Sequence, residues 1–297
     1  MKKKAAIRFW FQMTVSVFAP AKINLTLHVT GQRSDGYHKL DSFVVFPLIG
    51  DHVHVSQSDR LNLKITGKQA TTLSPDADNL VLRAARLLDP KGCADIVLEK
   101  RLPIAAGIGG GSADAAATLH ALDKLWGSAS PSISDMMKLG ADVPVCHHGG
   151  SARMRGAGEE LTPLAKMPDY MGILLVNPGV EVHTPEVFHG LNTRSNAPMP
   201  AQIPEFETAP DLCNWLKLQR NDLEESAIKI APVIQTVLDD IEKSDCLIAR
   251  MSGSGATCFG LYETQYEAKA ALKSIQSDQP NWWAVSSGFS HPRSDIS

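Results

Sequence analysis

The chain has 297 residues, 43% of them hydrophobic, so it can bury one large core or two smaller ones, and two domains are the better expectation at this length. Lys and Arg total 29 against 32 Asp and Glu, a net charge of -3 that offers no electrostatic case for binding nucleic acid or a membrane surface. Five scattered cysteines form no C-x-x-C pair, which fits reduced thiols in a cytoplasmic protein better than disulfides or a zinc site.

The N-terminus resembles a signal peptide only at first sight. Basic residues precede apolar ones, but Arg8 and Gln12 interrupt the apolar run and no small-residue cleavage site follows. We therefore read residues 1–12 as an N-terminal extension, for which disorder is one option. No stretch is long and apolar enough for a transmembrane helix.

The first half of the chain is predicted to be rich in strands. Apolar and polar residues alternate, with the period of a strand, in "TVSVFAPAKINLTLHVTG", "DHVHVSQ" and "LNLKITG". The segment "DNLVLRAARLLDP" has helical spacing, with Asp78 or Asn79 as a possible cap and Pro90 after its end. A strand, "ADIVLEKRLP", then leads into a glycine-rich loop and a helix from about Ser112 to Trp126.

The second half mixes helices and strands. A short helix, a turn at Gly140 and a short strand are followed by "MGILLVNPG", an apolar run typical of a strand buried on both faces. The helix in "HTPEVFHGL" is predicted to be capped by Thr184, and two later strands flank "SGSGA". The pattern predicts an α+β protein with two domains, residues 13–163 and 164–297.

The glycine-rich loop is the first candidate site. Four glycines occupy the five positions from Gly107 to Gly111, directly before an alanine-rich helix. The first N–H groups of a helix lack partners and carry partial positive charge, so bare backbone at that point favours a phosphate group. No lysine follows as in a Walker A loop, and Ser112 stands where a dinucleotide-binding loop needs glycine. A tight turn is the alternative, but glycine is costly to order.

Three further features are ambiguous by themselves. Lys22 lies on one face of a strand-like segment with Asn24, and a solvated strand lysine is the simpler interpretation. Asp142 sits in the apolar "GADVPV" and is either a cap or a functional carboxylate. The "SGSGA" segment is a hairpin turn or a close approach to a ligand. The paired histidines have no metal-ligand spacing.

In chain order these features resemble the GHMP small-molecule kinases. The segments that carry the resemblance are "PAKINL", "LPIAAGIGGGSADAAA", "GADVPV" and "MSGSGA", and together with "GQRSDGYHKLDS" and "TPEVF" it spans about residues 14–290. It is closest to the branch that acts on a diphosphocytidyl methylerythritol. The loop departs from the family at Ala105 and Ala106, where glycine is frequent.

The resemblance implies the two-domain GHMP kinase fold, with a β-rich, ATP-binding N-terminal domain, an α/β substrate domain and the active site in the cleft between them. It implies phosphorylation of the substrate 2-hydroxyl by ATP with Mg²⁺, on the non-mevalonate route to isoprenoids. The alternatives are a kinase for another alcohol, such as homoserine or a mevalonate derivative, and a non-catalytic nucleotide-binding protein. A cytoplasmic monomer or homodimer is expected.

The resemblance also implies roles for individual residues. Asp142 matches the residue that takes the hydroxyl proton and Lys22 its lysine partner, an arrangement that suits phosphoryl transfer. Asn79 matches a position near the adenine or ribose, and Ser112 could reach Mg²⁺. Asp114 could reach a metal, but a helix-dipole role is the simpler interpretation. The ATP phosphates are expected on Pro103, Ile104, Ala105, Ala106, Gly107, Ile108, Gly109, Gly110, Gly111, Ser112 and Ala113.

The cytosine end is expected at a second group of residues. Tyr37 and Phe188 match the two rings that stack on the base, and His38 matches the histidine that reads its polar edge. Thr184 matches a polar contact beside them, and Asn24 a substrate-contacting asparagine. Without the resemblance, Tyr37 would be read as a buried strand aromatic.

Overall fold

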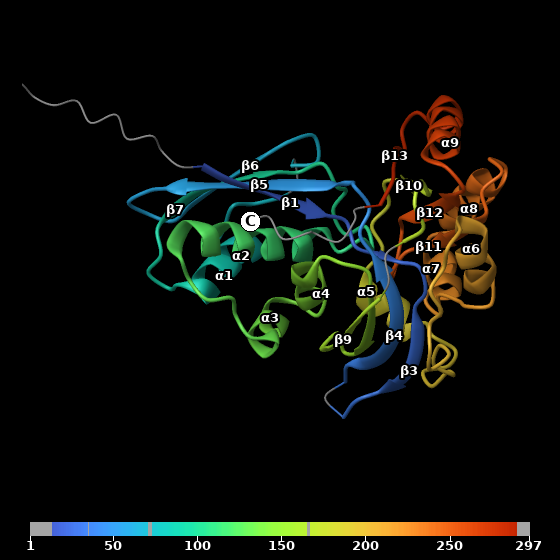
Figure 1. The fold of residues 1–297 in the computed structure, drawn as a ribbon, viewed down its shortest axis with the longest axis horizontal. Helices are drawn as coiled ribbons and strands as arrows, with labels where there is room; N and C mark the ends of the chain where they lie inside the picture. Colours follow the sequence, from blue (N-terminus) through green and yellow to red (C-terminus); the bar gives the residue numbers. More distant parts are fainter. Residues whose placement is uncertain (1–13, 35, 71–72, 165–166, 290–297) are drawn as a thin grey trace, which may run out of the picture.

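A computed structural model describes residues 14–34, 36–70, 73–164 and 167–289 (Figure 1). The predicted extension, residues 1–12, lies outside the described residues. The predicted α+β architecture is confirmed, since the described residues form three sheets, and helices pack against the first and the third of them.

The first sheet has the strand order β1-β5-β7-β6, and only β6 and β7 pair in parallel. Helices α1 and α2 lie against one face of it, as Figure 1 shows. Asn79 caps α1, because its side chain accepts a hydrogen bond from the N–H of Val81. The bounds are β1 (Thr14–Pro20), β5 (Gly50–Gln57), β6 (Asn62–Thr66), β7 (Ala94–Glu99), α1 (Leu80–Leu88) and α2 (Gly110–Trp126).

The second sheet has the order β2-β4-β8-β9, and β3 also pairs with β4. Its strands are β2 (Ile23–Asn24), β3 (His28–Gln32), β4 (His38–Val45), β8 (Ala152–Gly156) and β9 (Glu160–Pro163). The short helices α3 (Ile133–Leu139) and α4 (Val143–His148) precede β8. The sequence predicted a turn and then a strand here. The structure has α4 in between, with Pro144 in the first turn, where its missing N–H costs nothing.

The third sheet has the order β11-β12-β10-β13, all antiparallel. Leu174 and Val176 of β10 face the core with α8 and α9, while Ile173 and Leu175 face the core with α6, so β10 is buried on both faces, as predicted. The bounds are β10 (Gly172–Asn177), β11 (Ile248–Met251), β12 (Cys258–Tyr262), β13 (Trp283–Ser287), α5 (Thr184–His189), α6 (Ala209–Lys217), α7 (Glu224–Ile230), α8 (Val233–Glu242) and α9 (Gln265–Asp278).

The second and third sheets share a core. Ile23 and Phe43 from the second sheet lie in the same cluster as Ile173 and Phe259 from the third. Segments from both halves of the chain are therefore packed together around the site described below. The domain boundary between residues 163 and 164 stays a prediction.

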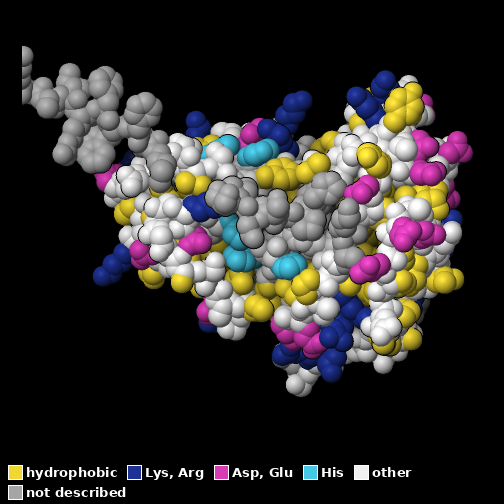
Figure 2. Space-filling model, in the orientation of Figure 1, with side chains coloured by type: hydrophobic (Ala, Val, Ile, Leu, Met, Phe, Trp, Pro, Cys, Tyr) yellow, Lys and Arg dark blue, Asp and Glu magenta, His cyan; other side chains and the backbone are white. Residues whose placement is uncertain are grey.

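Charges are mixed on the surface. Figure 2 shows Lys and Arg side chains spread among Asp and Glu on the visible face. Arg33 pairs with Glu159 and Arg155 with Glu160 in the hairpin region of β3, β8 and β9. Within the described ranges, no helix is long and apolar enough to cross a membrane.

Candidate active site

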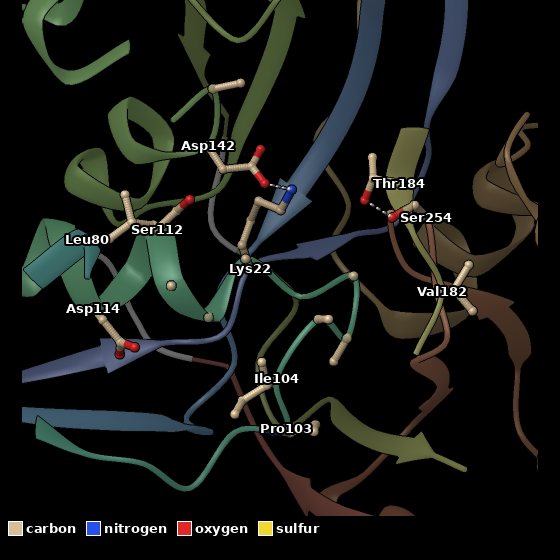
Figure 3. A pocket seen from close by; sticks show the side chains of 18 of the residues that line it. Lys22, Leu80, Pro103, Ile104, Ser112, Asp114, Asp142, Val182, Thr184 and Ser254 are labelled. Carbon is tan, nitrogen blue, oxygen red and sulfur yellow. Dashed lines mark hydrogen bonds and ion pairs between the residues drawn. The ribbon is translucent and has the colours of Figure 1, made fainter. Parts of the chain in front are cut away.

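A cavity of about 770 Å³ lies between the glycine loop, α1, the start of α4 and α5. Figure 3 shows that side chains from segments far apart in the sequence line it. It brings together most of the residues that the sequence singled out. These are Lys22, Asn24, Asn79, Pro103, Ile104, Ala105, Ala106, Gly107, Gly109, Gly110, Gly111, Ser112, Asp142, Thr184 and Phe188.

Four of the expected site residues do not line this cavity. Ile108 and Ala113 are buried in apolar clusters on either side of the loop. His38 is the first residue of β4, and Tyr37 directly precedes it. The glycine loop therefore contributes its backbone and small side chains to the cavity, while Ile108 anchors it to the core.

The glycine loop ends at an uncapped helix. Gly109 is the N-cap of α2 with a φ of 63°, and no side chain makes a cap hydrogen bond there. Gly107 has a φ of 72°, and a Cβ on it would lie 2.6 Å from the carbonyl oxygen of Ser252. Glycine at 107 thus allows close contact with the "SGSGA" hairpin, and glycine at 109 allows close approach of Lys22, because a Cβ there would lie 3.1 Å from the Lys22 Cβ.

The "SGSGA" segment is a hairpin turn that also braces the glycine loop. It joins β11 and β12, in which Met251 pairs with Cys258. The N–H of Thr257 donates to the carbonyl of Ala106, and the Ser252 hydroxyl donates to the carbonyl of Gly107. The hairpin interpretation is confirmed, and because Gly253 and Ser254 also line the cavity, close approach to a ligand stays a prediction.

Lys22 and Asp142 form an ion pair at the cavity wall. Lys22 Nζ lies 2.7 Å from Asp142 Oδ2, although 120 residues separate them in the chain (Figure 3). The Lys22 side chain is 6% exposed and that of Asp142 is 29% exposed. Asp142 occupies the N-cap position of α4 but makes no side-chain cap hydrogen bond, so its carboxylate is available to Lys22 and to the cavity.

Asp114 makes a different pair from the one expected. The sequence favoured a simple helix-dipole role, but Asp114 is buried and accepts a 2.8 Å hydrogen bond from Lys100 Nζ. Lys100 also pairs with buried Asp51, whose other oxygen accepts the N–H groups of Arg101 and Leu102. Burial, opposed by Lys100, raises the pKa of Asp114 to about 7. We call Asp51, Lys100 and Asp114 the buried triad.

The sequence reading missed Lys100, although a signal was present. Ala94, Ile96 and Leu98 are buried at alternate positions of β7, and Lys100 continues the same alternation. A lysine on a core-facing position requires acidic partners. Its partner Asp51 is 49 residues away in the chain, so the sequence could indicate the need but not the partner.

At the expected cytosine end, His38 stacks on Phe188, with ring centroids 4.4 Å apart and planes 19° apart. Tyr37 is 60% exposed, and the stacking of Tyr37 and Phe188 on the base stays a prediction. Burial, then the nearby Arg194, lowers the pKa of His38, so the ring is neutral at pH 7. His38 Nε2 is buried and has no hydrogen-bond partner among the described residues.

The prediction that Thr184 caps α5 is wrong. The N-cap is His183, and Thr184 is the first helical residue. Its hydroxyl instead lies 2.8 Å from that of Ser254 at the cavity wall (Figure 3). Asn79 uses its amide locally, since Nδ2 donates to the carbonyl of Ser74 and Oδ1 accepts from Val81.

The glycine-rich start of α2 and the lysine–aspartate pair lie in segments that match a known class of enzyme, the GHMP small-molecule kinases. The family models named GHMP kinases N terminal domain and GHMP kinases C terminal match residues 79–153 and 204–281. The chain belongs to the 4-diphosphocytidyl-2-C-methyl-D-erythritol kinase family within that class.

The relatives support this membership over nearly full length. A 4-diphosphocytidyl-2-C-methyl-D-erythritol kinase from Ruegeria pomeroyi is 55% identical over 275 residues, covering 92% of this chain and 98% of the relative. One from Cereibacter sphaeroides is 54% identical, covering 90% and 96%. A crystal structure of 4-(cytidine 5'-diphospho)-2C-methyl-D-erythritol kinase matches with a TM-score of 0.74 and 31% identity, covering 93% of this chain and all of that one. A homoserine kinase from Cytophaga hutchinsonii shares the fold at 20% identity, with a TM-score of 0.65, covering 95% of this chain and 98% of its own.

Proposed function

We propose that this ATP-dependent kinase transfers the γ-phosphoryl group of ATP to the 2-hydroxyl of 4-diphosphocytidyl-2-C-methyl-D-erythritol. The Lys22–Asp142 pair in the cavity carries this proposal. Relatives with that name at 55% and 54% identity favour this acceptor over homoserine, whose kinase matches at 20%.

Asp142 would act as the proton acceptor. Its Oδ2 is held by Lys22, and its Oδ1 makes no hydrogen bond among the described residues. The substrate hydroxyl would donate to that oxygen, and its proton would pass to Asp142 as the new O–P bond forms. The bond between the γ-phosphorus and its bridging oxygen breaks in the same step, and ADP leaves. Positioning matters most, because the transition state for phosphoryl transfer is loose.

The glycine loop would hold the ATP phosphates. The uncapped N–H groups at the start of α2 offer hydrogen bonds to phosphate oxygens, and the helix dipole adds positive potential. Lys22 lies against this loop, since its N–H donates to the carbonyl of Ile108. Its ammonium would stabilise charge on the transferring group.

The metal would enter with the nucleotide. Among the described residues, no three His, Cys, Asp or Glu side chains gather in a way that could hold an ion. Mg²⁺ would therefore be held mainly by the phosphates, where it neutralises their charge, and Ser112 at the cavity wall is the one protein ligand we expect.

His38 would read the cytosine edge. Its neutral ring and unpartnered Nε2 suit a hydrogen bond to the base, and the exposed Tyr37 beside it can close over the base by stacking. Phe188 supports the His38 ring from its other face. Homoserine and mevalonate have no cytosine base, so their binding would use neither His38 nor Tyr37.

The test is an acceptor comparison. Purified protein with ATP and Mg²⁺ is given the diphosphocytidyl substrate, homoserine or mevalonate, and ADP release is followed by a coupled assay. We expect turnover only with the diphosphocytidyl substrate. Turnover of homoserine or mevalonate without turnover of that substrate would contradict the proposal.

A further inference from the structure

Asn24 presents an unused hydrogen-bond acceptor at the cavity. The residue is fully buried and lines the cavity beside Lys22. Its Oδ1 has no hydrogen-bond partner among the described residues, and it faces Gly253, another lining residue. A buried carbonyl without a donor is costly, so an atom in this state at a ligand cavity calls for a donor from the ligand.

The orientation of the Asn24 amide is fixed by Ser42 of β4. Asn24 Nδ2 lies 2.7 Å from the Ser42 Oγ. The single hydroxyl proton of Ser42 is already donated to the carbonyl of Thr26. Ser42 Oγ can therefore only accept, and only the NH₂ end of the amide can face it. This relay decides the otherwise ambiguous choice between the two amide orientations.

The backbone of Asn24 is held from the opposite side. Its N–H donates to Ser252 Oγ, and that hydroxyl donates to the carbonyl of Gly107 in the glycine loop. Asn24 is thus fixed between β4 and the loop, while its Oδ1 atom has no hydrogen-bond partner among the described residues.

We propose that Ser42 is a positioning residue that turns the Asn24 carbonyl toward the cavity, where it accepts a hydrogen bond from a hydroxyl of the acceptor substrate. The inference rests on the proposed function for the identity of that substrate. Ser42 does not touch the substrate, and it acts only through Asn24. A ligand group without a proton to donate would meet the lone pairs of Oδ1 and be rejected.

The test is a double-mutant cycle on Ser42→Ala and Asn24→Ala, with kcat and KM measured for the alcohol and for ATP. We expect Ser42→Ala to lower kcat/KM for the alcohol about tenfold and to leave KM for ATP unchanged. In the Asn24→Ala background the same change should have no further effect, because the group it orients is gone. Ser42→Thr keeps the hydroxyl and should stay within about threefold of wild type.

Two results would overturn the inference: losses that multiply in the double variant, or a loss from Ser42→Ala no larger than that from Ser244→Ala. Ser244 is the matched control, because its hydroxyl contacts the Ile241 carbonyl and Tyr262 outside the cavity. If Ser42→Ala does not fold, Ser42→Cys replaces it, with an expected loss of about threefold through its weaker hydrogen bonds and the same two contrary results. If wild type phosphorylates another alcohol instead, the proposed function fails, and the cycle on that alcohol still decides the role of Ser42.

Discussion

Two lysine–aspartate groups lie close to the start of α2 and contribute residues to the same cavity wall, but their side chains differ in exposure. Lys22 and Asp142 form an open pair in which the aspartate side chain is 29% exposed. The buried triad is closed, since its three side chains are between 0 and 4% exposed. Figure 3 shows Asp114 apart from the Lys22–Asp142 pair. We therefore expect the same two residue types to serve phosphoryl transfer in the open pair and to stabilise the fold in the buried triad.

The two groups also differ in whether their carboxylate oxygens are already hydrogen-bonded. Asp51 uses both oxygens on Lys100 and on two backbone N–H groups, which ties β5 to the segment that enters the glycine loop. Asp142 has an oxygen left for a ligand. Removing a member of the triad should act on stability, whereas removing a member of the open pair should act on turnover.

The substitution Lys22→Met probes the open pair. We expect kcat to fall about 10²- to 10³-fold, because a cation aimed at the transferring charge is lost. The unfolding free energy should change by no more than about 1 kcal/mol, since water can reach Asp142. Steady-state kinetics and urea unfolding measure the two effects. A large loss of stability with kcat preserved would show that Lys22 stabilises the fold and does not act in turnover.

Lys100→Met is the matched change in the closed group. It leaves two buried carboxylates without their cation, so we expect a loss of about 3–5 kcal/mol in unfolding free energy. The exposed pair of Lys138 and Asp135 is the control, and Lys138→Met should cost at most about 1 kcal/mol. Equal losses from the two lysines, measured by urea unfolding, would show that the triad does not hold the fold.

Tyr37→Ala tests the expected cytosine end of the substrate site. We expect KM for the diphosphocytidyl substrate to rise about tenfold through the loss of one stacking ring, with KM for ATP unchanged. Tyr266 on α9, which is also largely exposed, supplies the control variant Tyr266→Ala. A rise of equal size in both KM values would remove Tyr37 from the cytosine site.

A buried histidine, His28, should make the stability of the fold depend on pH. Its Nδ1 donates to the carbonyl of Ala197 and its Nε2 accepts from the N–H of Arg220, so the ring is closed like the triad. Burial, then Arg220, lowers its pKa below the ordinary 6.5. Below pH 6.5, His28 binds a proton in the unfolded chain but not in the folded chain, whose His28 pKa is lower. The contribution of His28 to the unfolding free energy is therefore complete above pH 6.5 and decreases as the pH falls.

We expect the unfolding free energy to fall when the pH is lowered from 7 to 5, and the fall to be smaller in His28→Gln. Urea unfolding at both pH values measures it. An unchanged pH dependence in the variant would mean that His28 is not the group responsible.

The local features of this chain could be predicted, and the distant contacts could not. The glycine loop before α2, the Asn79 cap and the buried strand β10 follow from short-range patterns. Only the family resemblance brought Lys22 together with Asp142, because nothing in either segment names a partner 120 residues away. Helix α4 was missed because six residues around a proline give too little periodicity.

Side-chain detail was the least predictable level. His38 lies on the face of Phe188, and Thr184 contacts Ser254 in place of capping α5. Both outcomes depend on where α5 packs, against β4 for His38 and against the turn between β11 and β12 for Thr184, and no local sequence pattern encodes these contacts. Ser42 gave no signal at all, because its role depends on the side-chain pair that β2 and β4 bring together.

The most direct test of the account follows product formation by phosphorus NMR in wild type and Asp142→Asn, each with ATP, Mg²⁺ and the diphosphocytidyl substrate. We expect wild type to convert the γ-phosphoryl signal of ATP into a phosphomonoester on the substrate. Asp142→Asn, with the same unfolding midpoint to within a few degrees, should form it at least about a hundredfold more slowly. Phosphomonoester formation at the wild-type rate in that variant would contradict the role given to the open pair.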